Sequence, residues 1–185
     1  YYPPQKMLDQ IKYFFDTLLR NYPSGLETQN LNAARMLGID AKHIVVGNGA
    51  AELIRELGML CSGRMLVTVP VFNEYVRCFR NCELVKLESG DSDFSPPMES
   101  IVAMAQNVDI LALVNPDNPS GNFICRDEML QIIEMCSRYN TKIIVDESFV
   151  DFAEEKVRYT LLEENILTKY KNLIVIKSIS KSYGV

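Results

Sequence analysis

The chain has 185 residues, of which 48% are hydrophobic, 23% charged and 9% aromatic. This balance is typical of one folded domain, or slightly more, with a sizeable apolar core, and it excludes a disordered, collagen-like or disulfide-built chain. The net charge of −5 at pH 7 comes without a basic stripe, which argues against nucleic acid and anionic membranes as partners. The longest apolar runs, such as 110–114, are too short to span a bilayer.

The cysteines are expected to be buried, reduced thiols rather than a disulfide framework or a zinc site. Their number, five, is odd, and no two of them form a C-x-x-C pair. No signal peptide opens the chain, so we expect a cytoplasmic protein. Because the first residue is Tyr1 rather than Met, and the last residues closely follow Lys181, we also expect a piece of a longer protein. The five thiols are those of Cys61, Cys78, Cys82, Cys125 and Cys136.

Helical and strand periods alternate along most of the chain. The first helix is amphipathic and ends at Tyr22-Pro23-Ser24-Gly25, and the second ends at Gly38. In chain order, the expected elements are helices at 7–19 and 31–37, an extended run at 43–46, a helix at 50–60, a strand at 65–69, a helix at 73–81, strands at 84–87 and 109–114 with a helix at 98–105 between them, a helix at 127–139, and strands at 142–145 and 173–177.

The strands are solidly apolar and are separated by helices. This pattern is typical of a parallel sheet that is covered on both faces. The sequence therefore predicts an α/β fold with three layers, in which a mostly parallel sheet lies between helices. Residues 1–25 form an N-terminal helix and its connection, and residues 26–185 form the domain that contains the sheet.

Polar, aromatic and glycine residues come directly after the carboxyl ends of the predicted strands. In a parallel sheet these ends meet at one edge, where ligands bind. An aromatic ring, an amide, a carboxylate and an amine are thus expected at one edge, beside a glycine-rich helix start. Together they suit a flat, phosphorylated, electron-poor ring. The strand ends and their adjoining segments are Val46 with 47–49, Val69 with 70–72, Val114 with 115–121, Val145 with Asp146, and Lys177 with 178–181.

Four of these segments resemble the fold-type I enzymes that depend on pyridoxal 5′-phosphate (PLP). The segments are 47–54 (GNGAAELI), 115–121 (NPDNPSG), 146–149 (DESF) and 178–181 (SISK). The chain resembles the class I/II aminotransferases, and among them the branch of histidinol-phosphate aminotransferases and threonine-phosphate decarboxylases, from about Tyr22 to its last residue. Four segments in order are far more specific than one glycine motif. The resemblance implies that residues 26–185 are the PLP-binding large domain, without the C-terminal small domain.

Three side chains receive roles in the chemistry from this resemblance. Lys181 would form the Schiff base with PLP, and Asp146 would pair with the pyridine nitrogen and keep it protonated. Asn118 would donate a hydrogen bond to the phenolic oxygen of the ring. From the residues alone, Lys181 could also be a solvated lysine, and Asp146 could cap the next turn. Asn118 lies in a plain turn sequence, which could itself present the amide to the ring.

The resemblance also implies how the cofactor is bound. Its phosphate would lie on the backbone N–H groups of Gly49, Ala50 and Ala51, where the helix dipole favours an anion. The Ser178 hydroxyl would donate a further hydrogen bond to the phosphate, and Phe72 would stack on the pyridine ring. A tight glycine turn and a core aromatic are the alternatives for the glycine-rich helix start and for Phe72. No metal ligands are expected.

Tyr22 matches a tyrosine that, in relatives, reaches the phosphate in the active site of the neighbouring subunit. The resemblance therefore implies a homodimer with shared active sites. The alternative for Tyr22 is packing at the end of the first helix, beside Pro23.

The chain departs from many aminotransferases at Phe149, where they carry a tyrosine that donates to the phenolic oxygen. In this respect residues 146–152 look closer to the threonine-phosphate decarboxylases. The resemblance implies a PLP-dependent aminotransferase that acts on an amino acid or phosphorylated amine and a 2-oxo acid. The alternatives are a PLP-dependent decarboxylase of a phosphorylated amino acid and a non-catalytic domain of a fusion protein. The piece by itself is expected to be inactive, because the arginines expected after Lys181 lie outside it.

Overall fold

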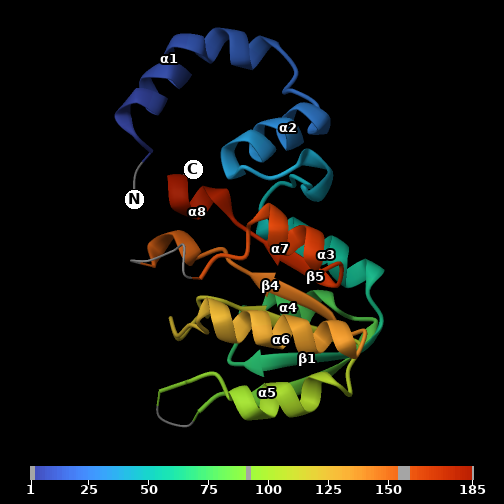
Figure 1. Ribbon diagram of the computed structural model, residues 1–185. Coiled ribbons are helices and arrows are strands. Elements are labelled where there is room, and N and C mark those ends of the chain that lie inside the picture. Colours follow the sequence, from blue (N-terminus) through green and yellow to red (C-terminus); the bar gives the residue numbers. More distant parts are fainter. Residues whose placement is uncertain (1–2, 91–92, 154–158, 185) are drawn as a thin grey trace.

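The computed structural model describes residues 3–90, 93–153 and 159–184, and its centre is a parallel β-sheet (Figure 1). Within these residues the sheet has five strands in the order β2-β1-β3-β4-β5, and all neighbouring pairs run parallel. The α/β fold with a parallel sheet is therefore confirmed. The strands are β1 (Gly63–Val69), β2 (Cys82–Glu88), β3 (Ile110–Val114), β4 (Lys142–Asp146) and β5 (Leu173–Ile176).

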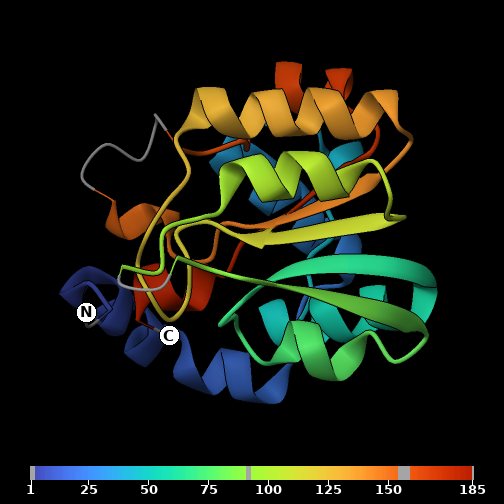
Figure 2. The same cartoon turned by 90° about the horizontal axis from the view of Figure 1, so that it is seen from below.

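Helices cover both faces of this sheet (Figure 2). Helices α5 and α6 lie on one face, and α3 and α4 lie on the other. The α-helices are α1 (Gln5–Arg20), α2 (Leu26–Leu37), α3 (Ala50–Leu60), α4 (Glu74–Cys78), α5 (Met98–Ala105), α6 (Arg126–Arg138), α7 (Glu164–Lys169) and α8 (Ile179–Tyr183), and the 3₁₀ turns are η1 (Ala41–His43) and η2 (Val150–Phe152).

Strand β3 is apolar and buried at every position, and its neighbour β4 is apolar and buried from Ile143 to Val145. Side chains alternate between the faces of a strand, so odd and even positions enter different cores. In β3, Leu111 and Leu113 pack in the core beneath α5 and α6, whereas Ile110 and Ala112 pack in the core beneath α3 and α4. The fold therefore has three layers, with one apolar core on each face of the sheet.

Helix α1 stands apart from the sheet at the top of Figure 1. It is amphipathic as expected, but none of its residues is buried. Its large apolar side chains, among them Phe14, Phe15 and Leu18, are exposed. The domain division at residue 25 remains a prediction.

Two expected elements differ in the structure. Residues 43–46 do not form a strand: η1 ends at His43, and the N–H of Val46 donates to Asn30 Oδ1 at 2.8 Å instead of to a neighbouring strand. Val46 therefore does not end a strand of the sheet, and this prediction was wrong. The helix expected at 73–81 is shorter, because Phe79 leaves the helical conformation with φ −84° and ψ 57°.

All five cysteines are free thiols, as expected, but only Cys61 and Cys136 are buried. Burial raises the pKa of the Cys136 thiol to about 12. Across the described residues, no helix has the length and apolar character needed to cross a membrane. The same residues contain no cluster of His, Cys, Asp and Glu side chains that could hold a metal ion.

Candidate active site

The carboxyl ends of β3, β4 and β5 lie level with one another. Val114 pairs with Asp146, and Asp146 pairs with Ile176. The N–H of Asn115 donates to the Asp146 carbonyl at 2.8 Å, and the N–H of Glu147 donates to the Ile176 carbonyl at 2.7 Å. The segments after these strands therefore leave the sheet at one edge. Strand β1 runs parallel to β3 and ends at Val69, so its carboxyl end lies at the same edge. Four of the five strand ends that the sequence named are thus found there.

Asp146 ends β4 and is 3% exposed. Its Oδ1 accepts a hydrogen bond from the N–H of Ser148 at 2.9 Å, which caps the next turn. Its Oδ2 accepts one from the hydroxyl of Tyr75 in α4 at 3.0 Å. Burial, and then the negative charge of Asp146, raise the pKa of the Tyr75 hydroxyl well above its ordinary value, so that it stays a donor. Both carboxylate oxygens are thus held in fixed directions.

Lys181 lies in α8 with its amine over aromatic rings. Its Nζ is 4.3 Å from the centroid of the Phe149 ring and 5.8 Å from that of the Phe72 ring. Among the described residues, no carboxylate forms an ion pair with this amine, and the side chain is only half-exposed. The structure therefore brings together Lys181, Phe72 and Phe149, three residues that the sequence analysis discussed.

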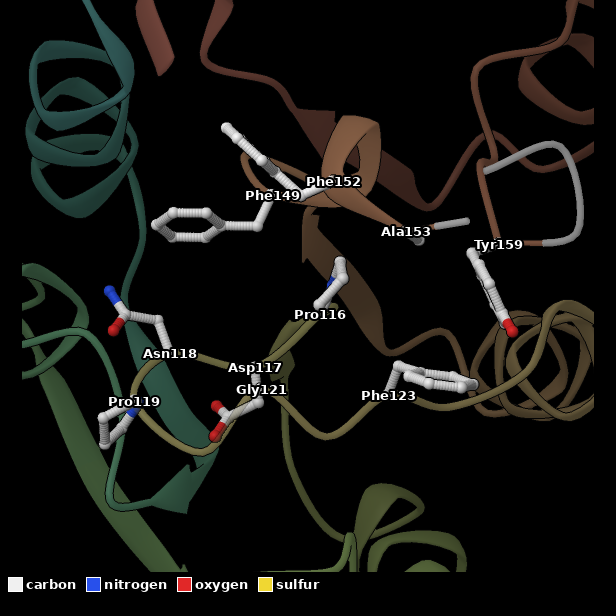
Figure 3. Close-up of a pocket in the computed structure, with 10 residues that line it drawn as sticks. All are labelled: Pro116, Asp117, Asn118, Pro119, Gly121, Phe123, Phe149, Phe152, Ala153 and Tyr159. Carbon is white, nitrogen blue, oxygen red and sulfur yellow. The ribbon is translucent and has the colours of Figure 1, made fainter. Parts of the chain in front are cut away.

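A cavity of about 600 Å³ lies between the loop after β3 and the segment after β4 (Figure 3). Asn118 and Phe149 lie at one end of it, and Phe123 and Tyr159 at the other, where their ring centroids are 4.4 Å apart. Lys181 and Asp146 are not among its lining residues. The Phe149 ring, however, both lines the cavity and contacts the Lys181 amine. The lysine amine therefore lies next to the cavity whose wall includes Asn118. The lining residues are Pro116, Asp117, Asn118, Pro119, Gly121, Phe123, Phe149, Phe152, Ala153 and Tyr159.

The expected phosphate site begins at Gly49, whose φ of +87° suits glycine and lets the chain enter α3. The first N–H groups of a helix have no acceptor within the helix, so those of Ala50 and Ala51 are available to an anion. The N–H of Gly49, in contrast, donates to the Gly47 carbonyl at 2.9 Å. Ala50 is buried, whereas Gly49 and Ala51 are exposed. The carboxylate of Glu52 accepts from the N–H of Asn48 at 2.5 Å, which holds the turn that leads into the helix.

Ser178 and Tyr22 lie in contrasting surroundings. Ser178 is buried at the start of α8, where its Oγ lies 3.1 Å from Ser180 Oγ. Tyr22 lies between α1 and α2 and is 100% exposed. Packing at the helix end, the alternative weighed for Tyr22, is therefore wrong, and its contact with a second subunit stays a prediction.

Glu147 is a buried ionisable group that the sequence analysis did not assign to the site. It is fully buried, and its carboxylate accepts hydrogen bonds from the N–H of Leu161 at 2.6 Å and from Thr160 Oγ1 at 2.8 Å. Burial raises the pKa of Glu147 to about 7, although both hydrogen bonds oppose the shift. The position of Glu147 directly after Asp146 was the feature of the sequence that could have indicated a place at the site. A second charged residue at a strand end is usually solvated, however, which is why the sequence did not reveal its burial.

The comparisons with known proteins agree with this geometry. Residues 21–185 match the family of class I and II aminotransferases, and the chain belongs to this family. It is 31% identical over 176 residues to an L-serine phosphate decarboxylase of Campylobacter jejuni, a match that covers 91% of this chain and 45% of the relative. It is 26% identical over 195 residues to a histidinol-phosphate aminotransferase of Leuconostoc mesenteroides, with 100% and 53% covered.

The fold is likewise similar to a solved structure of a decarboxylase from Sulfurospirillum multivorans. The TM-score is 0.84 at 26% identity, over 98% of this chain and 49% of that one. The chain spans about half the length of these relatives.

PLP is the cofactor of this family, and the residues present fit it. Ser148 is buried beside Asp146, and its Oγ has no hydrogen-bond partner among the described residues. The uncommitted amine of Lys181 and the open N–H groups at the start of α3 are likewise available. An orphaned hydroxyl, an amine, a fixed carboxylate and an anion-binding helix start are groups that suit a phosphorylated pyridine aldehyde.

Proposed function

We propose that the whole protein is a PLP-dependent aminotransferase that takes the amino group of an amino acid or phosphorylated amine and passes it to a 2-oxo acid. One observation carries this proposal: the Lys181 amine has no carboxylate partner among the described residues and lies over Phe149. The helix that carries it follows β5, and the neighbouring strand β4 ends at the buried Asp146. A lysine that binds an aldehyde needs an accessible amine in a partly dehydrated site.

The chain's own residues would divide the work among them. Lys181 would hold the cofactor covalently, and Asp146 would face the ring nitrogen, with Tyr75 and the Ser148 N–H fixing the direction of its charge. Asn118 would donate to the phenolic oxygen, and Phe72 would cover one face of the ring. When bound, PLP supplies an electron-accepting ring that weakens the bonds at the substrate Cα.

The phosphate would be held at the start of α3. The N–H groups of Ala50 and Ala51 would donate to it, with the Ser178 hydroxyl as a further donor, while the N–H of Gly49 holds the turn by donating to the Gly47 carbonyl. We also propose that the protein is a cytoplasmic homodimer, in which the exposed Tyr22 of each copy reaches the phosphate of the other.

A second candidate is the decarboxylation of a phosphorylated amino acid. Phe149 favours it, because a phenylalanine cannot donate to the phenolic oxygen as the tyrosine of many aminotransferases does. The 31% identity to an L-serine phosphate decarboxylase favours it too, whereas the family match to aminotransferases supports the first candidate. The two reactions differ in which Cα bond is held perpendicular to the ring.

The test uses the full-length protein loaded with PLP. Borohydride reduction and peptide mass mapping should place a pyridoxyl group on Lys181. The Lys181→Ala variant should carry none there, and Lys171→Ala, which removes an exposed lysine, should be labelled like the wild type. The absence of label on every lysine would contradict the proposal and favour a non-catalytic domain. Release of carbon dioxide from phosphothreonine, or formation of glutamate from histidinol phosphate and 2-oxoglutarate, then identifies the reaction.

A further inference from the structure

A second lysine lies close to the first but is bound to a carboxylate. Lys177 comes directly after the end of β5, and its Nζ lies 2.5 Å from Asp151 Oδ2. The two side chains are 14% and 19% exposed, so the pair is largely screened from water. The same Oδ2 accepts a hydrogen bond from the hydroxyl of Ser182, also at 2.5 Å. One carboxylate oxygen thus joins two residues that lie on either side of Lys181 in the sequence.

The Asp151 carboxylate links three segments that follow or adjoin the strand ends at this edge of the sheet. Asp151 belongs to η2, Lys177 adjoins β5, and Ser182 belongs to α8. Helix α8 has only five residues, which is too short to be stable without contacts to the rest of the protein. Since Ser182 adjoins Lys181 and Asp151 lies two residues after Phe149, the carboxylate fixes both sides of the contact between the lysine amine and the Phe149 ring.

The two amines therefore have different surroundings. Lys177 donates its protons to a carboxylate, and an ammonium group that is held in this way has no lone pair for a carbonyl carbon. Lys181 faces two aromatic rings and, in the part of the chain that is described, has no carboxylate partner. Breaking a largely buried ion pair leaves an uncompensated charge, so Lys177 stays bound as long as Asp151 is present.

We propose that Asp151, Lys177 and Ser182 form a clamp that positions Lys181 for the cofactor and withholds Lys177 from it. Asp151 is then a positioning residue, which acts through Lys177 and Ser182. The inference rests on the proposed function, because it concerns which of two lysines binds the aldehyde of PLP. It goes beyond that function because it names Asp151, a residue outside the expected cofactor site, as the group that determines which of the two lysines binds the aldehyde.

The decisive experiment compares two variants of the full-length protein. Each is loaded with PLP and reduced with borohydride, which adds hydride to the carbon–nitrogen double bond and so preserves the link for mass mapping. In Lys181→Ala, the intact clamp should leave Lys177 unlabelled. In the double variant Lys181→Ala with Asp151→Ala, Lys177 should become the main labelled lysine. Equal labelling of Lys177 in both variants would overturn the proposal.

A second measurement needs no cofactor. Loss of a hydrogen bond to a charged group should speed amide hydrogen exchange of residues 179–184 in Asp151→Ala by about ten- to a hundredfold. Ser182→Ala removes one arm of the clamp and should give a smaller increase, and it keeps the test available if Asp151→Ala does not fold. Unchanged exchange in whichever of these variants folds would overturn the proposal.

A matched control is Glu163→Ala, which breaks the ion pair between Arg126 and Glu163. That pair is 2.6 Å long and its side chains are 25% and 33% exposed. The control should change neither the labelled lysine nor the exchange of residues 179–184. If the wild type carries no label on any lysine, the proposed function fails. If the wild type is labelled on Lys181, while Lys177 stays unlabelled in the double variant and the exchange in Asp151→Ala is unchanged, only the clamp fails.

Discussion

The buried carboxylate of Glu147 should make the stability of the protein depend on pH. Burial raises its pKa from 4.5 to about 7 in the folded state. The folded protein therefore holds this proton more tightly than the unfolded chain, so the stabilisation is complete below pH 4.5 and is lost as the pH rises through 7. At roughly 1.4 kcal/mol per pKa unit, the free energy of unfolding should fall by about 2–3 kcal/mol between about pH 5 and pH 8 because of this group.

The measurement is urea unfolding of the cofactor-free, full-length protein at about pH 5 and pH 8, monitored by circular dichroism. Glu147→Gln keeps an amide in place of the carboxyl that binds Leu161 N–H, but it cannot titrate. The difference in stability between wild type and variant should therefore change by the stated amount between the two pH values. Glu88→Gln, which alters an exposed carboxylate, should show no such change. A constant difference for Glu147→Gln would refute a raised pKa at this site.

Three further outcomes are expected at the edge of the sheet. Asp146→Asn should keep its cofactor but lose several orders of magnitude in turnover, because the electron sink acts mainly in the transition state; near-normal turnover with reduced stability would leave Asp146 only its turn-capping role. Asn118→Ala should raise the pH at which the bound cofactor changes colour and Phe149→Tyr should lower it, since each changes a donor to the phenolic oxygen; absorbance titrations without a shift in either would contradict this. Tyr75→Phe removes the donor to Asp146 Oδ2 and should lower the free energy of unfolding in urea by about 1.5–3 kcal/mol.

The sequence predicted the sheet well, because a parallel strand that is buried on both faces is a nearly continuous apolar run. All five residues of β3 are buried, and its apolar run was visible in the sequence. The same reasoning failed at 43–46, where a run of isoleucine and valine looks like a strand. There the N–H of Val46 finds its acceptor on the side chain of Asn30, 16 residues earlier. Because Asn30 lies outside residues 43–46, the pattern of apolar residues within the run cannot indicate this contact.

The site was predictable where a residue's position after a strand determines its place. Asp146 and Lys181 come after neighbouring parallel strands, so both had to reach the same edge. Tyr75 was assigned no role in the site, because an aromatic residue after a strand is more often part of the core. Its hydroxyl meets Asp146 across 71 residues of sequence. Such a contact depends on how α4 packs on the sheet, which composition and spacing do not encode.

The two lysines at the end of β5 show most clearly what spacing leaves open. Lys177 and Lys181 lie four positions apart among similar neighbours, and the sequence distinguishes them only through the resemblance to a family. In the structure, the pairing of β4 with β5 brings Asp151 to Lys177 although 26 residues separate them. The carboxylate forms an ion pair with one lysine, and the other is left over the ring of Phe149. The segment that follows β4 thus gives the two lysines different surroundings, because β4 and β5 are parallel neighbours and the residues after both strands meet at one edge.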